Sequence, residues 1–305
     1  MKQTPYDKDG LTSVIFSTKA VSIWNNQKGP VFWYAAGVPG PFYVNTEKLI
    51  GAESAEKLLA SISKIVAMEV SAEEKSSMVE TVVMNEYAAN ETFQKIIATM
   101  VHDCRTQFGD KYNTISGGER RDWFFSIPFA IESGLDHIYL FKNGGIHIKP
   151  HNNDGQKSED TKILHVADLI NNAASYFNSW IPILEKHGLS MMGTACVITR
   201  GSAGTDKLCD IGIPVCSLKT IDKSYFDELH TISLIDKDTT EEIGNYFDCK
   251  ENWARRYILS KPDLLGNETL DAKSKERLKS FLENDPWNLR TNDNAFFETL
   301  IATLK

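Results

Sequence analysis

An acid and a small polar loop follow one of the apolar runs of the sequence. Asp168 comes after the run at 162–166, and residues 171–175, Asn-Asn-Ala-Ala-Ser, then open a helical pattern. Unpaired backbone N–H groups at the start of a helix lie at its positive end, and together they suit a phosphate group. The same residues also fit a plain connection in which Ser175 caps the helix. The segment therefore predicts either an anion site or a structural turn.

A second candidate anion site is the turn SGGERRDW, residues 116–123. Gly117 and Gly118 allow positive φ and a close approach of the backbone to a ligand. Arg120 and Arg121 could each contact phosphate oxygens through two hydrogen bonds. The alternative is a tight turn with two solvated arginines. Two glycines followed by two arginines at a strand-to-helix turn favour the phosphate interpretation.

The segment NGGIHIKPHNNDGQKSED, residues 143–160, is rich in turn-forming residues. Asn143-Gly144 is a hairpin signal. A long loop in an ordered core is more often a lid or binding loop than a connector, so we expect this segment to be mobile. The cationic side chains in and beside it are Lys142, His147, Lys149 and His151. Each could contact an anionic ligand, and each also fits a solvated loop residue.

The elements that must position these residues alternate in type. Short apolar runs predict strands at 112–115, 137–141, 162–166, 194–199 and 213–218. Helical patterns at 123–132 and 175–187 lie between them, and Gly134 and Gly188 stand where helix C-caps are expected. Strands separated by helices imply a mostly parallel sheet flanked by helices, so the predicted fold class is α/β.

Helical patterns dominate the sequence on both sides of this alternation. Residues 54–69 have an amphipathic helical pattern, and Ser71 with Glu74 has the spacing of a capping box before further helices. Past Ile221 the alternation stops, and 273–282 looks helical. We therefore expect an N-terminal segment at 1–50, an α/β core at 51–222 and a helical extension at 223–305.

Composition and charge exclude several classes of function. The 305 residues are 42% hydrophobic and 24% charged, which allows a substantial core. A net charge of −8, with both signs spread along the chain, offers no basic surface for nucleic acid. No apolar run approaches the roughly 18 residues of a membrane span, and the polar N-terminus has no signal-peptide pattern. The five cysteines lack CxxC spacing, so we expect reduced thiols in a soluble, cytoplasmic protein.

The order of these candidates resembles that of the type I phosphoribosyltransferases, and of orotate phosphoribosyltransferase in particular. The family signature has two adjacent acids followed by Thr-Thr-Gly-Gly-Ser, and ADLINNAAS, residues 167–175, lies at that point. FWYAAGVPGPFYVN, residues 32–45, is similar to the family's N-terminal substrate segment and retains the aromatic pair Phe42 and Tyr43. A later strand ending in ITRGSAG, followed by GIPVCSLKTID, continues the agreement over about two thirds of the chain.

The resemblance implies an enzyme that displaces pyrophosphate from phosphoribosyl pyrophosphate by a ring nitrogen of a pyrimidine-type base. Mg²⁺ is expected to enter with the phosphoribosyl pyrophosphate, with no metal ligand supplied directly by the protein, and a homodimer is expected. In that frame Asp168 binds the ribose, and Lys149 and His151 belong to the loop that closes over the transferring group. The residues expected at the 5′-phosphate are Asn171, Asn172, Ala173, Ala174 and Ser175. Those expected at the pyrophosphate are Gly117, Gly118, Arg120 and Arg121, and Phe42 and Tyr43 would stack on the base.

Several positions depart from the family's pattern. The first acid of the pair would stand at Ala167, so ribose affinity should be reduced. Ala173 and Ala174 replace two glycines, and an alanine forced to positive φ costs on the order of 1 kcal/mol. The family's substrate-contacting lysine would fall at Ala35, which argues against orotate itself as the base.

These departures leave a second hypothesis open, in which the chain is a catalytically inactive member that binds a nucleotide or sugar phosphate in a regulatory or partner-binding role. The lost acid, glycines and lysine favour this hypothesis, whereas the SGGERR turn and the retained loop favour catalysis. A third possibility is that Trp253 and Trp287 of the extension form an oligomerisation surface and that the ancestral site is inert.

Overall fold

The structure is a computed structural model that describes residues 3–24, 31–34, 37–151, 161–260 and 271–303. Ala35 and residues 152–160 of the expected lid lie outside the described residues. The chain divides into two compact units, each of which is discontinuous in sequence. Unit 1 comprises residues 1–20 and 45–222, and unit 2 comprises residues 21–44 and 223–305.

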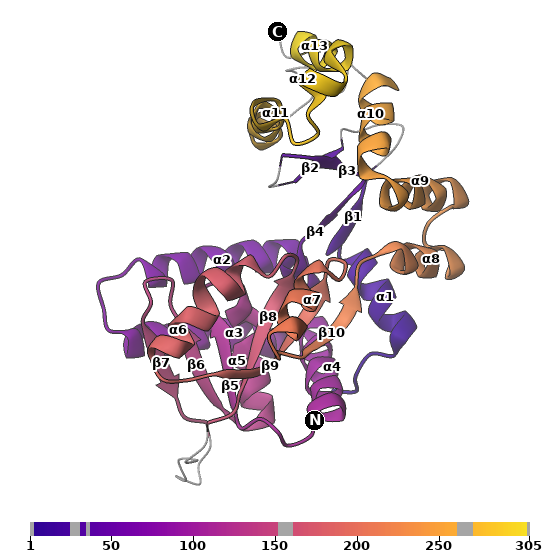
Figure 1. Cartoon of the computed structure of the whole chain (residues 1–305). Coiled ribbons are helices and arrows are strands. Elements are labelled where there is room, and N and C mark those ends of the chain that lie inside the picture. Colours follow the sequence, from indigo (N-terminus) through magenta and orange to yellow (C-terminus); the bar gives the residue numbers. More distant parts are fainter. Residues whose placement is uncertain (1–2, 25–30, 35–36, 152–160, 261–270, 304–305) are drawn as a thin grey trace. The chain divides into compact units, whose positions relative to one another are not determined.

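A six-stranded sheet forms the centre of unit 1 (Figure 1). Its strands are β5 (Thr114–Gly118), β6 (Asp136–Leu140), β7 (Ile146–Lys149), β8 (Ile163–Ile170), β9 (Met191–Thr199) and β10 (Val215–Thr220). The order across the sheet is β10-β9-β8-β5-β6-β7, and all neighbours are parallel except β6 and β7. The predicted α/β fold class with a mostly parallel sheet is therefore confirmed, and β5 and β8 end side by side.

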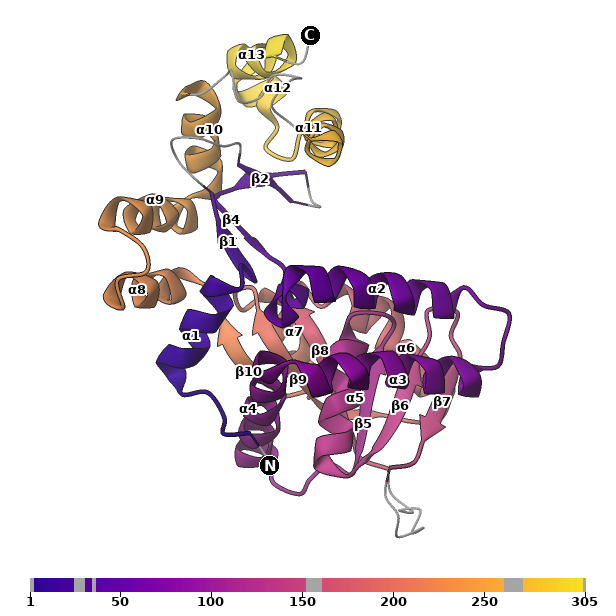
Figure 2. The same ribbon diagram turned by 180° about the vertical axis from the view of Figure 1, so that it is seen from behind.

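Helices cover both faces of this sheet (Figures 1 and 2). The helices on one face are α3 (Ala72–Ala89), α4 (Glu91–Phe108) and α5 (Asp122–Ser133). The other face carries the π-helix η2 (Tyr176–Trp180), α6 (Ile181–Lys186) and α7 (Ala203–Asp210). Trp180 and Leu184 pack there with Ile138 and Ile163 of the strands. Because both faces are covered, the strands are apolar along most of their length, which explains why the sequence shows them as continuous runs.

The remaining elements of unit 1 precede the sheet in sequence. They are α1 (Lys8–Ser17), the 3₁₀ helix η1 (Thr46–Ile50) and α2 (Ala52–Val66). The capping box predicted before α3 is present: Ser71 Oγ accepts from Glu74 N at 3.1 Å, and Glu74 Oε2 accepts from Ser71 N at 3.0 Å. Helix α2 corresponds to the amphipathic pattern predicted at 54–69.

The segment predicted as a mobile loop begins instead with a strand. β7 pairs antiparallel with β6 after a turn in which Gly144 has a φ of 86° and Asn143 Oδ1 accepts from Gly145 N at 3.0 Å. The hairpin signal at Asn143-Gly144 is thus confirmed, and the prediction of a loop over 146–149 is wrong. The reason is that β6 supplies the backbone partners of β7, which local composition does not reveal.

Unit 2 combines short strands with helices. β1 (Val21–Ile23) pairs antiparallel with β4 (Phe42–Val44), and β2 (Phe32–Trp33) pairs with β3 (Pro39–Gly40). Its helices are α8 (Lys223–Thr231), α9 (Lys237–Asp248), α10 (Lys250–Ser260), α11 (Ala272–Asn284), α12 (Leu289–Asn292) and α13 (Asn294–Thr303). The predicted C-terminal helices are present, whereas no pattern in the sequence predicted these two- and three-residue strands.

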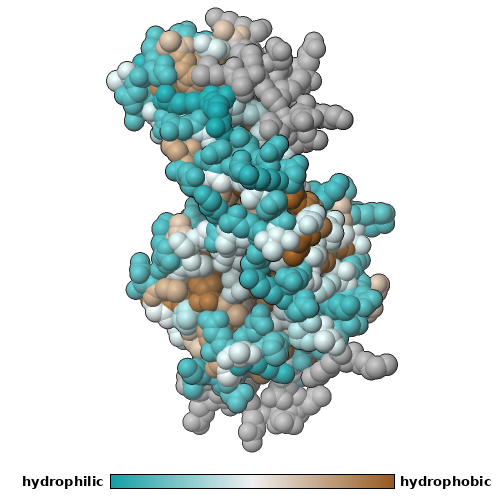
Figure 3. Space-filling model, turned by 90° about the vertical axis from the view of Figure 1, so that its right-hand side faces the viewer, coloured by the Kyte–Doolittle hydropathy of each residue, from teal (hydrophilic) through white to brown (hydrophobic). Residues whose placement is uncertain are grey.

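Exposed apolar side chains are scattered over the described surface. The large ones are Met68, Val70, Ile148, Phe177, Ile211 and Leu234. On the face drawn in Figure 3, hydrophilic atoms surround small hydrophobic patches, which is ordinary for a protein surface. Within the described ranges, no helix has both the length and the apolar character that a membrane crossing requires.

Gly117 lies within strand β5, where there is no room for a side chain. A Cβ there would lie 2.5 Å from the Cβ of Ser126 on α5, whose hydroxyl is hydrogen-bonded to His137 Nε2. Gly117→Ala should therefore lower the free energy of unfolding by about 2 kcal/mol, measured by urea denaturation. The control is Gly145→Ala, whose added methyl meets only the Asn143 side chain at 3.1 Å. Equal losses in the two variants would contradict the packing argument.

Candidate functional site

A pocket of about 460 Å³ opens where β5 and β8 end. Its walls come from the turn 119–122, the strand end 167–169, the helix start at 175–176 and residues 179–180, together with Leu59 and Lys142. The site residues predicted from sequence that meet in this pocket are Arg120, Arg121, Asp168 and Ser175. Ligands of open α/β sheets bind at this edge, beyond the carboxyl ends of the strands.

Both arginines of the turn are held in place by other parts of unit 1. The Arg120 guanidinium donates to Ser63 Oγ on α2 at 2.5 Å. Arg121 Nε donates to Glu47 Oε2 on η1 at 2.6 Å, and the two side chains form an ion pair. A guanidinium carries five N–H donors, so a single bond to Ser63 orients Arg120 without exhausting it. The turn therefore presents oriented cations at the wall of the pocket.

Asp168 is a half-buried acid in the same pocket. Its Oδ2 accepts from Thr46 Oγ1 at 2.8 Å, and its backbone N donates to Asp122 Oδ1 at 3.2 Å. Burial, followed by the nearby charge of Asp122, raises the pKa of Asp168 to about 7; the bond from Thr46 and the charge of Arg121 act in the opposite direction. A carboxyl group that titrates near neutral pH inside a pocket is a candidate functional group.

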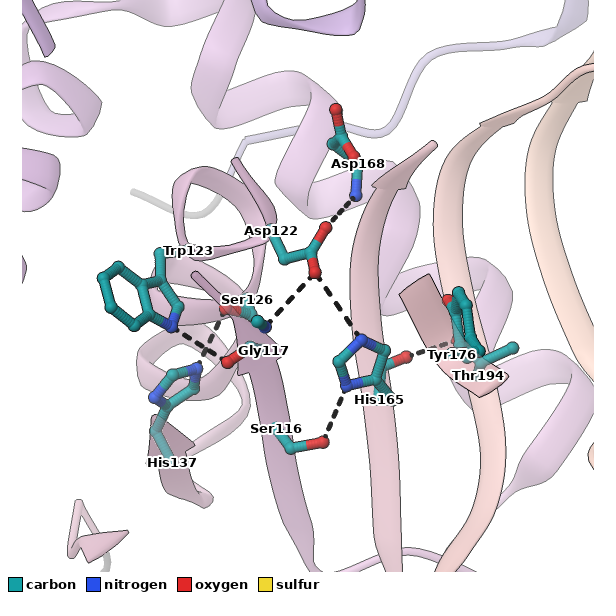
Figure 4. Close-up of polar contacts among 11 residues, drawn as sticks. Ser116, Gly117, Asp122, Trp123, Ser126, His137, His165, Asp168, Tyr176 and Thr194 are labelled. Atoms are coloured by element: carbon teal, nitrogen blue, oxygen red, sulfur yellow. Dashed lines mark hydrogen bonds and ion pairs between the residues drawn. The ribbon is translucent and has the colours of Figure 1, made fainter. Parts of the chain in front are cut away.

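Asp122, which the sequence analysis did not single out, joins both strand ends (Figure 4). Its Oδ2 accepts from Gly118 N at 3.2 Å and lies 3.7 Å from Nε2 of the buried His165, while Oδ1 accepts from Asp168 N. On its other side, His165 Nδ1 is hydrogen-bonded to Ser116 Oγ at 2.9 Å. One pattern in the sequence could have pointed to Asp122: it is an acid at the start of a predicted helix, and carboxylates are favoured at the positive end of a helix.

The expected phosphate loop, 171–175, is closed by its own contacts. Asn172 Oδ1 accepts from Ala174 N at 3.1 Å, which occupies one of the amides that a phosphate would use. Ala173 has a φ of 58° and is buried, so the backbone strain expected from sequence is present. Ser175 stands at the N-cap of η2, as the alternative interpretation expected, but its side chain makes no capping hydrogen bond. Asn171, Asn172 and Ala174 are exposed and do not line the pocket.

Lys149 and His151 lie at the amino edge of the parallel strands. Lys149 stands opposite His137 in the β6–β7 ladder, and its Nζ donates to Glu80 Oε1 on α3 at 2.9 Å. His151 Nε2 lies 3.4 Å from Glu80 Oε2. Neither residue lines the pocket, whereas Lys142, which precedes the hairpin turn, does.

Phe42 and Tyr43 belong to β4 of unit 2. The Phe42 ring is 1% exposed and packs against Phe226 and Phe247 at centroid distances of 5.0 and 5.6 Å. Tyr43 is partly exposed, and its ring is tilted against Phe32 at 5.8 Å. Of the two predicted base-stacking residues, only Tyr43 has an accessible ring.

The oxygen ligands of the pocket fit a magnesium ion that enters with its ligand. No cluster of three or more His, Cys, Asp or Glu side chains in the described part of the chain is arranged to hold a metal ion. The pocket does hold the carboxyl groups of Asp122 and Asp168, and carboxylate oxygens are the ligands that Mg²⁺ prefers. Mg²⁺ commonly uses one or two carboxylates together with substrate phosphates, so two acids are sufficient.

No family model matches the sequence. No curated protein matches it either. Among solved structures, UMP synthase from Leishmania donovani is 12% identical with a TM-score of 0.49, and the match covers 80% of this chain and 42% of that one. This chain therefore spans less than half of the length of that protein.

Two orotate phosphoribosyltransferases are also similar in structure. The Francisella tularensis structure is 12% identical over 77% of this chain and 95% of its own, with a TM-score of 0.46. The Aeropyrum pernix structure is 15% identical over 72% of this chain and 99% of its own, with a TM-score of 0.42. Because these TM-scores lie below 0.5, the function is argued from the pocket alone.

The raised pKa of Asp168 predicts a dependence of stability on pH. Because the folded-state pKa of Asp168 is about 7 and the ordinary pKa of an aspartate is 3.8, the folded state holds the proton more tightly, and wild-type stability is lost as pH rises between these values. Asp168→Asn removes the ionisation, so the stability of the variant relative to wild type should be greater at pH 8 than at pH 5, by on the order of 1 kcal/mol after allowance for partial exposure.

Urea denaturation at pH 5 and at pH 8 measures this difference. Any effect of losing the hydrogen bond from Thr46 is present at both pH values, so it cancels when the two measurements are subtracted. Asp210→Asn, at the exposed end of α7, is the matched control and should show no such difference. A relative stability of Asp168→Asn that is the same at pH 5 and pH 8 would show that the carboxyl group titrates normally.

Proposed function

We propose that the chain binds magnesium phosphoribosyl pyrophosphate in this pocket and transfers the phosphoribosyl group to a pyrimidine-type base. The observation that carries the proposal is the meeting of Arg120, Arg121, Lys142 and Asp168 in one pocket at the carboxyl edge of the sheet. Three cations suit the phosphate oxygens, and the acid suits the hydroxyl groups of a ribose. A ligand with both kinds of group matches this arrangement.

An adjoining hollow supports the presence of a second ligand. It has a volume of about 490 Å³ and shares Leu59 and Arg120 with the pocket. Its other walls include Ala52, Ala55 and Ala60 of α2. Small apolar walls beside an anion pocket leave room for a flat ring next to the sugar, as transfer requires.

The reaction breaks one bond and forms one. A deprotonated ring nitrogen of the base attacks C1 of the ribose, the C1–O bond to pyrophosphate breaks, and pyrophosphate leaves with the electron pair. Arg120 and Lys142 would neutralise charge on the departing group, and Asp168 would hold the ribose. When bound, magnesium would supply further charge neutralisation on the pyrophosphate, with Asp168 and Asp122 as the carboxylates available to it.

A second candidate function is binding of a nucleotide or sugar phosphate without turnover, in a regulatory or partner-binding role. Three observations favour it, and the first two are that Asn172 occupies the amide of Ala174 and that the Phe42 ring is buried. Lys149 and His151 are also engaged with Glu80, away from the pocket. The expectations of a homodimer and of a cytoplasmic location stay predictions.

Calorimetry with phosphoribosyl pyrophosphate and Mg²⁺ tests the proposed ligand. Wild type should bind it, and Lys142→Ala should weaken binding about tenfold, because a cation at the pocket wall is lost. Lys111→Ala is the matched control, since Lys111 is an exposed lysine outside the pocket, and its affinity should change less than about twofold. No binding by wild type would overturn the proposal.

Release of pyrophosphate with a panel of pyrimidine-type bases then separates the two candidates. Turnover with at least one base, abolished in Arg120→Ala, is the expected result for a transferase. Binding of phosphoribosyl pyrophosphate without release of pyrophosphate from any base would favour the non-catalytic role.

A further inference from the structure

We propose that Asp122 supplies the second carboxylate of the ribose site, in place of the acid that the family signature would put at position 167. The inference rests on the proposed function and identifies a side chain that would bind the hydroxyl groups of the ribose. Asp122 reaches the pocket from the first turn of α5, whereas the missing acid would have come from β8. The acid pair is therefore rebuilt from two separate elements.

Position 167 holds an alanine, Ala167, which lines the pocket but carries no charged group. Neighbouring residues of a strand face opposite sides of the sheet, so Ala167 and Asp168 point apart. Ala167 is 2% exposed and packs with Ile170, Tyr176 and Leu208.

Asp122 lies next to Asp168 in the pocket, where a second carboxylate could bind the ribose. Its side chain is 11% exposed and lines the same pocket, and its Oδ1 accepts from Asp168 N at 3.2 Å. The charge of Asp122 is also felt by the Asp168 carboxyl group, whose pKa it helps to raise. The two acids therefore act on one small region of the pocket.

The orientation of the Asp122 carboxylate is fixed by Gly118 and His165. Gly118 N donates to Oδ2, and His165 Nε2, fully buried, lies 3.7 Å from the same oxygen. A Cβ on Gly118 would lie 2.2 Å from the Trp180 ring and 2.7 Å from Asp122 Oδ2, so glycine at 118 makes room for both side chains. A group fixed before the ligand arrives loses little entropy on binding it.

The chemistry of a fixed carboxylate predicts selectivity for hydroxyl groups. Each carboxylate oxygen has two acceptor sites, so an oxygen that already accepts from a backbone amide can still accept from a ribose hydroxyl. A site built to bind a hydroxyl group discriminates against a ligand that lacks it, because the buried acceptor is then left unpaired. Asp122 should therefore distinguish ribose from deoxyribose.

The test compares ribose 5-phosphate with 2-deoxyribose 5-phosphate, each with Mg²⁺, by calorimetry. Wild type should prefer the ribose compound by about tenfold or more, as expected when one charged acceptor loses its donor. Asp122→Asn should reduce this preference to below about threefold, because the charged acceptor of the hydroxyl group is lost. Asp210→Asn, on the exposed end of α7, should keep the full preference.

Circular dichroism and inorganic pyrophosphate binding establish that Asp122→Asn is folded. If it is not, Asp122→Glu is the second variant, because it keeps the charge but displaces the carboxylate by one methylene, and it should lose the preference as well. The inference would be overturned by a folded variant at position 122 that retains the wild-type preference for ribose, even if phosphoribosyl pyrophosphate still binds.

The inference would also be overturned by a wild-type protein that binds the ribose and deoxyribose compounds with equal affinity. Failure of wild type to bind phosphoribosyl pyrophosphate is a different result, and it would overturn the proposed function.

Discussion

The hydrogen bonds that the Asp122 carboxylate accepts from Gly118 N and Asp168 N are the contacts on which the pocket depends. They join the end of β5, the end of β8 and the first turn of α5, three elements that meet only in the folded chain. Backbone N–H groups at such strand ends have lost their ladder partners, and a buried amide without a partner costs free energy. One side chain therefore satisfies the backbone and shapes the wall of the pocket at the same time.

The pocket separates charges in a way that the whole-chain composition hides. The chain carries a net charge of −8, yet Arg120, Arg121 and Lys142 gather around one opening whose inner surface holds Asp122 and Asp168. Electrostatic interactions in a partly enclosed pocket are stronger than those at an open surface, so this local pattern outweighs the net charge. A ligand with anionic groups at one end and hydroxyl groups at the other complements both the cations at the opening and the carboxyl groups inside the pocket.

The loop 171–175 shows how a strained alanine can persist. Ala173 adopts a φ of 58°, which costs an alanine on the order of 1 kcal/mol. Its methyl group is buried in a cluster with Ile170, Tyr176 and Leu208, and burial of one such group contributes about 0.8 kcal/mol. The two effects are of similar size, so the left-handed turn of a glycine loop is kept while its inner surface is filled.

The sequence by itself determined the α/β alternation, the capping box at Ser71 and the conjunction of two glycines with two arginines, because each is a local pattern with a local physical cause. Only the tertiary structure decided which charged residues share a pocket. Lys149 and Lys142 are seven residues apart, yet the β6–β7 hairpin sends Lys149 to the opposite edge of the sheet. Asp122 and Asp168 are distant in sequence and meet because β5 and β8 are neighbours. Strand order and register arise from long-range pairing, and local composition does not encode them.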